Sequence, residues 1–191
     1  MLARTLIFLL TTLGDLFALA LLLRFMLQWL RAPARNPVSA LVAALTDFVV
    51  RPARRVVPGL WGLDLATLTL AWLVELAQIW LVLQLRGYEL GSAVGVAMVA
   101  LGALAALQLL RLALYVVMAA VLLQAVLSWV NPYSPIAPLL ASVARPFLRP
   151  VQKLVPPIAN VDLSPLAVLI ICQLLLTVPL SALEAAVGRL L

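Results

Sequence analysis

The side chains with the most chemical potential in this sequence are ionisable residues inside long apolar runs. Asp15 lies in the middle of the first run, Glu75 in the middle of the second, and Arg111 within the third. Charge inside a membrane is costly, so such residues pair with one another or line a functional path. Two interpretations follow: a buried ion pair such as Glu75–Arg111 that joins the two halves of the chain, or an ion or proton path.

The sequence lacks the usual sets of catalytic and metal-binding residues. Histidine is absent, which excludes Ser-His triads, zinc sites built on histidine and haem held by a protein histidine. Cys172 is the only cysteine, so no intrachain disulfide forms, and its apolar surroundings predict a packing residue. No nucleophile–base pair or cluster of metal ligands stands out. We therefore expect a protein that is not an enzyme and that carries no cofactor.

The composition indicates a membrane protein. Hydrophobic residues make up 66% of the 191 residues and charged residues 10%, and the mean hydropathy is +1.19. A soluble domain is about half apolar and a quarter charged. A membrane span takes about 20 residues, and we predict an all-α membrane protein with four transmembrane helices. The apolar runs are residues 5–30, 65–85, 93–130 and 163–183.

The third run is long enough to be ambiguous. As one helix it would measure about 57 Å, against about 30 Å for a hydrocarbon core. Either one long helix tilts or protrudes, or two spans meet near Arg111. Turn-forming residues are missing around Arg111, so we predict one long or bent helix with residues 108–130 as its spanning part. In the fourth run, Pro179 predicts a kink.

One segment of the chain occurs twice in the sequence. Residues 36–68 and 131–166 both open with Asn-Pro, pass through an apolar stretch to Arg-Pro and a basic cluster, and turn at proline before Asp-Leu. From Arg-Pro to Asp-Leu the two copies keep a constant offset of 98 residues. We predict two tandem repeats, 1–92 and 93–191, each made of a span, a basic segment and a span. The motif residues are Asn36, Pro37, Pro52, Pro58 and Asp64 in the first copy, and Asn131, Pro132, Pro150, Pro156, Asp162, Ser164 and Pro165 in the second.

Each repeated segment is expected to form an amphipathic helix in the membrane interface. Asn36 suits a helix N-cap and Pro37 suits the first helical position. The sequence predicts a helix over 37–50, about 21 Å long and too short to span, which Pro52 ends. Its guanidinium groups would lie at the level of the lipid headgroups.

An acidic residue precedes the span that follows each repeated segment. Asp64 is expected to cap the second span, because its carboxylate can accept hydrogen bonds from the free N–H groups of the helix start. In the second copy the cap is either Asp162 or Ser164, which stands before Pro165.

Basic residues gather in the repeated segments. Residues 31–64 hold five arginines and residues 131–162 hold three basic residues, whereas the opposite side of a four-span protein holds three. The positive-inside rule places the repeated segments in the cytoplasm and both termini outside it. These residues serve either as topology signals and phosphate anchors or as a docking surface. The candidates for docking a lipid or a partner are Arg51, Arg54, Arg55, Arg145, Arg149 and Lys153.

The doubled pattern Asn-Pro, Arg-Pro-x-x-Arg/Lys-x-x-Pro, Asp-Leu resembles the YggT family, also called YlmG, over nearly the whole chain. The first copy departs from it, since Ala66-Thr67 replaces Ser-Pro and Gly59 replaces the second proline. The resemblance implies a small integral membrane protein of bacterial plasma membranes and plastids. It links the chain to relatives with roles in cell division, osmotic-stress tolerance and haem attachment in a photosynthetic cytochrome complex. The resemblance therefore indicates where the protein is located, and it does not indicate a single mechanism shared by the family.

Two functions are compatible with these features. The first is a non-enzymatic scaffold or assembly factor of the bacterial plasma membrane, whose basic face binds anionic lipid or an unidentified membrane or cytoplasmic protein. The second is an ion or solute transport component in osmotic adaptation. Four spans per chain are few for a transport path, so we expect a homo-oligomer for this second function. Nucleic-acid binding is not expected, because aromatic residues lie in the apolar runs and not beside the few basic ones. A transport path would be lined by Asp15, Glu75, Gln78, Gln173 or Arg111.

Overall fold

The computed structural model describes residues 1–33, 36–59, 62–87, 94–154 and 162–190, and within these ranges it is all-helical without a β-strand. The proposed boundary between the repeats, at residues 92 and 93, and the motif residue Pro156 lie outside the described residues. The elements in order are α1 (Leu2–Trp29), α2 (Pro37–Val56), α3 (Leu65–Leu85), α4 (Val94–Val130), α5 (Ala137–Leu154), α6 (Ser164–Leu175), the π-helical turn η1 (Leu176–Leu180) and α7 (Ser181–Gly188).

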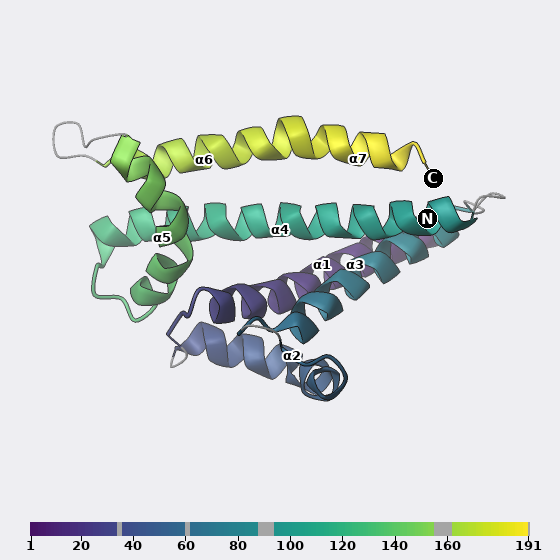
Figure 1. Ribbon diagram of the computed structural model, residues 1–191, viewed down its shortest axis with the longest axis horizontal. Coiled ribbons are helices and arrows are strands. Elements are labelled where there is room, and N and C mark those ends of the chain that lie inside the picture. Colours follow the sequence, from purple (N-terminus) through teal and green to yellow (C-terminus); the bar gives the residue numbers. More distant parts are fainter. Residues whose placement is uncertain (34–35, 60–61, 88–93, 155–161, 191) are drawn as a thin grey trace.

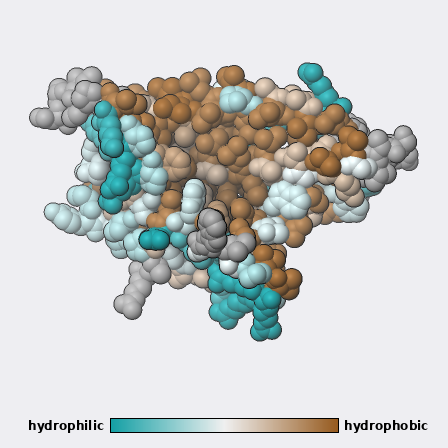
Figure 2. Space-filling model, in the orientation of Figure 1, coloured by the Kyte–Doolittle hydropathy of each residue, from teal (hydrophilic) through white to brown (hydrophobic). Residues whose placement is uncertain are grey.

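Four helical stretches are long and apolar enough to cross a membrane, which confirms the predicted number of spans. A helix satisfies its own backbone hydrogen bonds, so it can enter lipid where an open segment cannot. Figure 1 shows both termini at one end of the molecule, while α2 and α5 follow the far ends of α1 and α4. Figure 2 shows apolar side chains along the long helices and hydrophilic ones over α5 and α2. The four stretches are Ala3–Trp29, Leu65–Leu85, Gly95–Val130 and Ser164–Gly188.

The third run forms one helix, as predicted. In its N-terminal part Ala100, Leu101 and Ala105 are buried, and α4 packs against α3 and α7. Small residues allow helices to approach closely in a membrane bundle. The first turns of α4 therefore belong to the bundle and do not lie apart as a surface segment.

The fourth run is irregular at the predicted proline. Pro179 lies within η1, between α6 and α7. Proline has no N–H group to donate, so the regular α-helical hydrogen bonding cannot pass through it, and a π-helical turn takes up the irregularity.

The prediction that Pro52 ends the first helix of the repeated segment was wrong. α2 continues through Pro52 to Val56, and α5 likewise contains Pro146 and Pro150. One internal proline removes a single helical hydrogen bond, and the flanking turns can continue. At 20 residues, α2 is about 30 Å long. α2 is therefore long enough to cross a membrane, but its composition is not apolar enough for it to count as a fifth span.

Two groups of three helices pack through similar contacts. α1, α2 and α3 contact one another, and so do α4, α5 and α6. The groups meet mainly where α3 packs on α4. There the indole N–H of Trp72 donates a hydrogen bond to the carbonyl of Gly102 at 2.9 Å. A Cβ atom on Gly102 would lie 3.1 Å from the Trp72 ring, so glycine permits this close approach.

Candidate functional site

The predicted acidic cap of the second span is formed, whereas the one predicted for the fourth span is not. Asp64 caps α3 by accepting a hydrogen bond from the backbone N–H of Thr67 at 3.3 Å, and it also accepts one from the Thr67 hydroxyl. Asp162 accepts a hydrogen bond from the backbone N–H of Ser164 at 2.9 Å. α6 begins at Ser164 with Leu163 at its N-cap and no side-chain cap hydrogen bond, so neither Asp162 nor Ser164 is the cap that was predicted for the second copy. Asn36 caps α2 by accepting from the N–H of Ser39 at 2.8 Å.

A side chain of the preceding helix reaches each of these two aspartates. Arg54 of α2 donates to Asp64 at 2.5 Å, and Gln152 of α5 donates to Asp162 at 2.9 Å. Both donors lie ten residues before their acceptors. Burial raises the pKa of Asp64, but hydrogen bonds from Arg54 and Thr67 outweigh burial and hold it below its usual value.

A second ion pair ties α2 to α1. The guanidinium of Arg24 donates to the hydroxyl of Thr46 at 2.7 Å and to the carboxylate of Asp47 at 2.8 Å. Arg51 donates to the other oxygen of Asp47 at 2.6 Å. The hydrogen bond from Arg24 is the main cause that lowers the pKa of Asp47. These contacts hold α2 against the bundle.

The predicted docking residues therefore fall into two classes. Arg51 and Arg54 pair with carboxylates. The other four are exposed, and no carboxylate of the described residues lies within ion-pair distance of them. We call these four the basic surface: Arg55 on α2, and Arg145, Arg149 and Lys153 on α5.

The predicted Glu75–Arg111 ion pair was wrong. Arg111 on α4 instead forms an ion pair with Glu184 on α7. Its guanidinium is directed toward α7 and not toward α3, so it ties together helices of the second half. Glu75 is fully buried, and neither of its carboxylate oxygens has a hydrogen-bond partner among the described residues. Asp15 accepts a hydrogen bond from the side-chain N–H of Gln78 at 2.6 Å.

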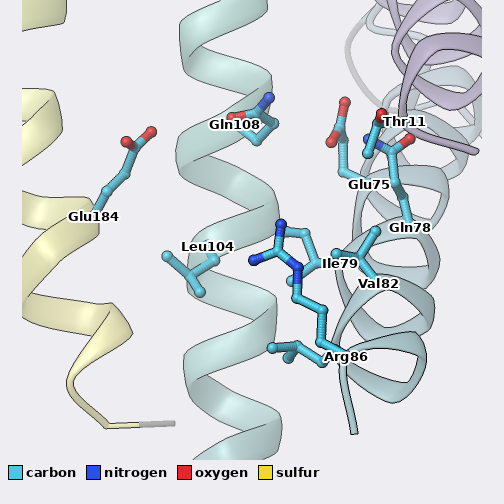
Figure 3. Close-up of a pocket in the computed structure, with 10 residues that line it drawn as sticks. Thr11, Glu75, Gln78, Ile79, Val82, Arg86, Leu104, Gln108 and Glu184 are labelled. Atoms are coloured by element: carbon cyan, nitrogen blue, oxygen red, sulfur yellow. The ribbon is translucent and has the colours of Figure 1, made fainter. Parts of the chain in front are cut away.

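Polar side chains from four helices converge on one pocket of about 320 Å³ within the bundle. The pocket extends along α3 from Glu75, near the middle of the helix, to Arg86 at its end. Figure 3 shows Glu75 near Thr11 and Gln78, with Gln108 on the facing helix α4 and the Arg86 guanidinium directed inward. The polar lining residues are Thr11 on α1, Glu75, Gln78 and Arg86 on or at the end of α3, Gln108 on α4 and Glu184 on α7.

The pocket unites several residues that the sequence singled out. Glu75 and Gln78 line it directly, while Asp15 joins through Gln78 and Arg111 through Glu184. Gln173, by contrast, is exposed on α6 and does not line it.

Four polar lining residues were not predicted from the sequence. The criterion that selected Asp15, a polar residue within or beside an apolar run, would also have selected them. It could not have shown which of them face one another. They are Thr11, Arg86, Gln108 and Glu184.

The family model described as CCB3/YggT matches residues 3–85 and 103–183 of this chain. The chain belongs to the CCB3/YggT family. The uncharacterised protein PA0392 of Pseudomonas aeruginosa is 36% identical over 184 residues, which cover 95% of this chain and 91% of that protein. The uncharacterised protein YggT of Escherichia coli K12 is 31% identical over 188 residues, covering 98% and 95%.

A third CCB3/YggT relative, an uncharacterised protein of Haemophilus influenzae, is 33% identical over 159 residues, covering 82% of this chain and 81% of that protein. No solved structure matches the chain. The names of these relatives state no activity, and nothing in them points to catalysis. The family model and these relatives confirm the resemblance to the YggT family that the doubled motif indicated.

Proposed function

We propose that this CCB3/YggT protein is a non-enzymatic scaffold or assembly factor of the bacterial plasma membrane, and that its basic surface holds anionic lipid. The observation that carries the proposal is the exposure of Arg55, Arg145, Arg149 and Lys153 without a carboxylate partner among the described residues. Because these side chains lie on helices outside the four apolar spans, they are positioned to meet headgroups.

The arrangement of the helices supports a single cytoplasmic basic face. Both termini lie at one end of the molecule, and α2 and α5 follow the far ends of α1 and α4 (Figure 1). α5 also contacts α1, across the boundary between the two halves. Under the positive-inside rule this arrangement puts α2 and α5 in the cytoplasm and both termini outside it.

A tandem duplication of residues 1–92 and 93–191 accounts for this arrangement. The family model matches one stretch in each half. The hydrogen bonds Arg54–Asp64 and Gln152–Asp162 join residues at corresponding positions of the two copies. A repeat with two spans per unit returns the chain to the same side each time, so both basic segments share one face.

Lipid is favoured over a protein partner because α2 exposes apolar and basic side chains together. Val42, Thr46 and Val50 face the bundle, whereas Leu41 and Phe48 are exposed. A helix of this kind suits the interface, where apolar groups enter lipid and cations meet phosphate. Each basic residue near an anionic surface contributes about 1 kcal/mol of attraction.

Replacing all four residues of the basic surface by glutamine is expected to weaken binding of phosphatidylglycerol by about a thousandfold, because four cations at about 1 kcal/mol each amount to about 4 kcal/mol. Binding can be measured with a fluorescent short-chain phosphatidylglycerol and the purified chain in neutral detergent at low salt. Arg54 is left intact, since its ion pair with Asp64 belongs to the fold.

The matched control replaces Arg4 and Arg189 by glutamine, because both are exposed at the opposite end of the molecule. This control should bind phosphatidylglycerol as the wild type does, and phosphatidylcholine should bind all variants equally. Unchanged binding of phosphatidylglycerol to the fourfold variant would contradict the lipid proposal. Loss of a crosslinked protein from the same variant, with lipid binding intact, would assign the surface to a protein partner.

A transport component is the second candidate, and the polar pocket between α1, α3, α4 and α7 favours it. Four spans per chain make a homo-oligomer the expected transporting form. This alternative predicts Na⁺ or K⁺ flux into liposomes that contain the purified protein, with less flux for Glu75→Gln. Flux no greater than that of empty liposomes, before and after an osmotic step, would remove this candidate.

A further inference from the structure

The pocket beside Glu75 has an excess of hydrogen-bond acceptors. Among the described residues, six buried side-chain oxygen atoms lack a partner, and four of them belong to Glu75, Gln78 and Glu184. All three residues line this pocket. Buried polar groups are normally satisfied, because a group without a partner loses the hydrogen bonds that it made with water. These oxygens require a proton donor or a cation, and an anion would not satisfy them.

The amide of Gln78 is held in a fixed position beside Glu75. Its side-chain N–H donates to Asp15 at 2.6 Å. Its oxygen lies against α1 at Gly14, where an added Cβ atom would stand 1.7 Å away. Because only glycine leaves room for this oxygen, the sequence and the packing together place an acceptor at this point of the α1–α3 contact.

The charges around the pocket leave one negative charge in excess. The charged groups that line the pocket with Glu75, or that bond to its lining residues, are Asp15 on α1, Arg86 at the end of α3, Arg111 on α4 and Glu184 on α7. Of the other charged residues on α1, Arg24 is paired with Asp47 and Arg4 is exposed near the N-terminus. Arg111 is paired with Glu184. Glu75 and Arg86 are separated by about 16 Å along α3, further than their side chains reach. One positive charge near Glu75 would therefore balance the cluster.

We propose that Glu75 and its neighbours bind a monovalent metal cation, Na⁺ or K⁺, in exchange for a proton. The Glu75 carboxylate and the side-chain oxygens of Gln78, Gln108 and Thr11 supply hard oxygen ligands of the kind such ions take. Without the ion the carboxyl group keeps its proton, and when the ion binds, one proton leaves. No group of three or more His, Cys, Asp or Glu residues suited to a metal occurs among the described residues, which favours a monovalent over a divalent ion.

The site belongs to one half of the chain only. At the offset of 98 residues, the counterpart of Glu75 is Gln173, which is exposed on α6. The inference concerns binding and does not depend on the scaffold proposal, nor on whether an ion crosses the membrane.

Carbodiimide labelling tests the exchange on the wild-type chain. Dicyclohexylcarbodiimide adds to a protonated carboxyl group in apolar surroundings, and mass spectrometry locates the adduct. The full chain in neutral detergent is labelled in NaCl, in KCl and in N-methylglucamine chloride at equal ionic strength. We expect Glu75 to be labelled in N-methylglucamine chloride and several-fold more slowly in NaCl or KCl, with stronger protection at higher pH. Equal labelling rates in the three salts would overturn the proposal.

Thermal unfolding provides a second measurement that needs no reagent in the pocket. Na⁺ or K⁺ should raise the unfolding midpoint of the wild type above its value in N-methylglucamine chloride, because a ligand of the folded state stabilises it. Glu75→Gln should lose this rise, while Asp162→Asn, which removes a carboxylate outside the pocket, should keep it. A rise of equal size in Glu75→Gln, or none in the wild type, would show that the pocket holds only water and would overturn the proposal.

Discussion

Replacing Arg111 by leucine is expected to lower the free energy of unfolding by about 3 kcal/mol, because Glu184 would be left as an unpaired charge among apolar helices. The two side chains form the ion pair between α4 and α7 and are 30% and 23% exposed. Glu184→Leu is expected to cost a similar amount. The double variant should return to within about 1 kcal/mol of the wild type, since no unpaired charge remains.

Unfolding of the four proteins in mixed micelles, with increasing sodium dodecyl sulfate, gives the coupling energy between positions 111 and 184. Arg4→Leu serves as the control for loss of a cation, because Arg4 is exposed and near the N-terminus. If the losses of the two single variants add in the double variant, the ion pair does not couple α4 to α7, and the placement of Arg111 is wrong.

The second large effect is expected at the cap of α3. Asp64→Ala should lower the free energy of unfolding by about 3 kcal/mol, because it removes the cap and leaves Arg54 without its carboxylate. Asp64 is 4% exposed and Arg54 is 43% exposed, so we attribute most of the loss to the cap and the bonds from Thr67 and little to the arginine. Asp162→Ala, at the corresponding and exposed position of the second copy, should cost about 1 kcal/mol, because it removes only the hydrogen bonds from Gln152 and Ser164 and no helix cap.

The cap also predicts a pH dependence. The pKa of Asp64 is lower in the folded protein than its usual value, so the charged form stabilises the fold. This contribution is fully present above the unfolded pKa of about 3.9 and is lost as the pH falls through the lower folded pKa. The difference in unfolding free energy between wild type and Asp64→Ala should therefore shrink below about pH 4. A difference that stays constant into strong acid would show that charge does not contribute to the cap.

The sequence by itself determined the four apolar spans and the caps at the starts of α2 and α3. Apolar length decides whether a segment crosses a membrane, so the four spans could be counted before any contact was known. Capping is equally local, because the acceptor and the helix start lie within a few residues of each other. For this reason Asn36 and Asp64 were placed correctly, and Pro179 marked the irregular turn of the last span.

Only the tertiary structure decided which faces meet. The helical period places Arg111 on one side of α4, but α4 packs against both α3 and α7, and the sequence does not say which neighbour that side contacts. The structure directs Arg111 to Glu184 and leaves Glu75 unpaired. The prediction that the helix ends at Pro52 was wrong for a related reason. It considered only the local effect of proline, whereas the contacts of α2 with α1 and α3 hold the helix together beyond Pro52. The pocket arises in the same way, because its polar residues come from four helices whose mutual rotation is fixed by packing.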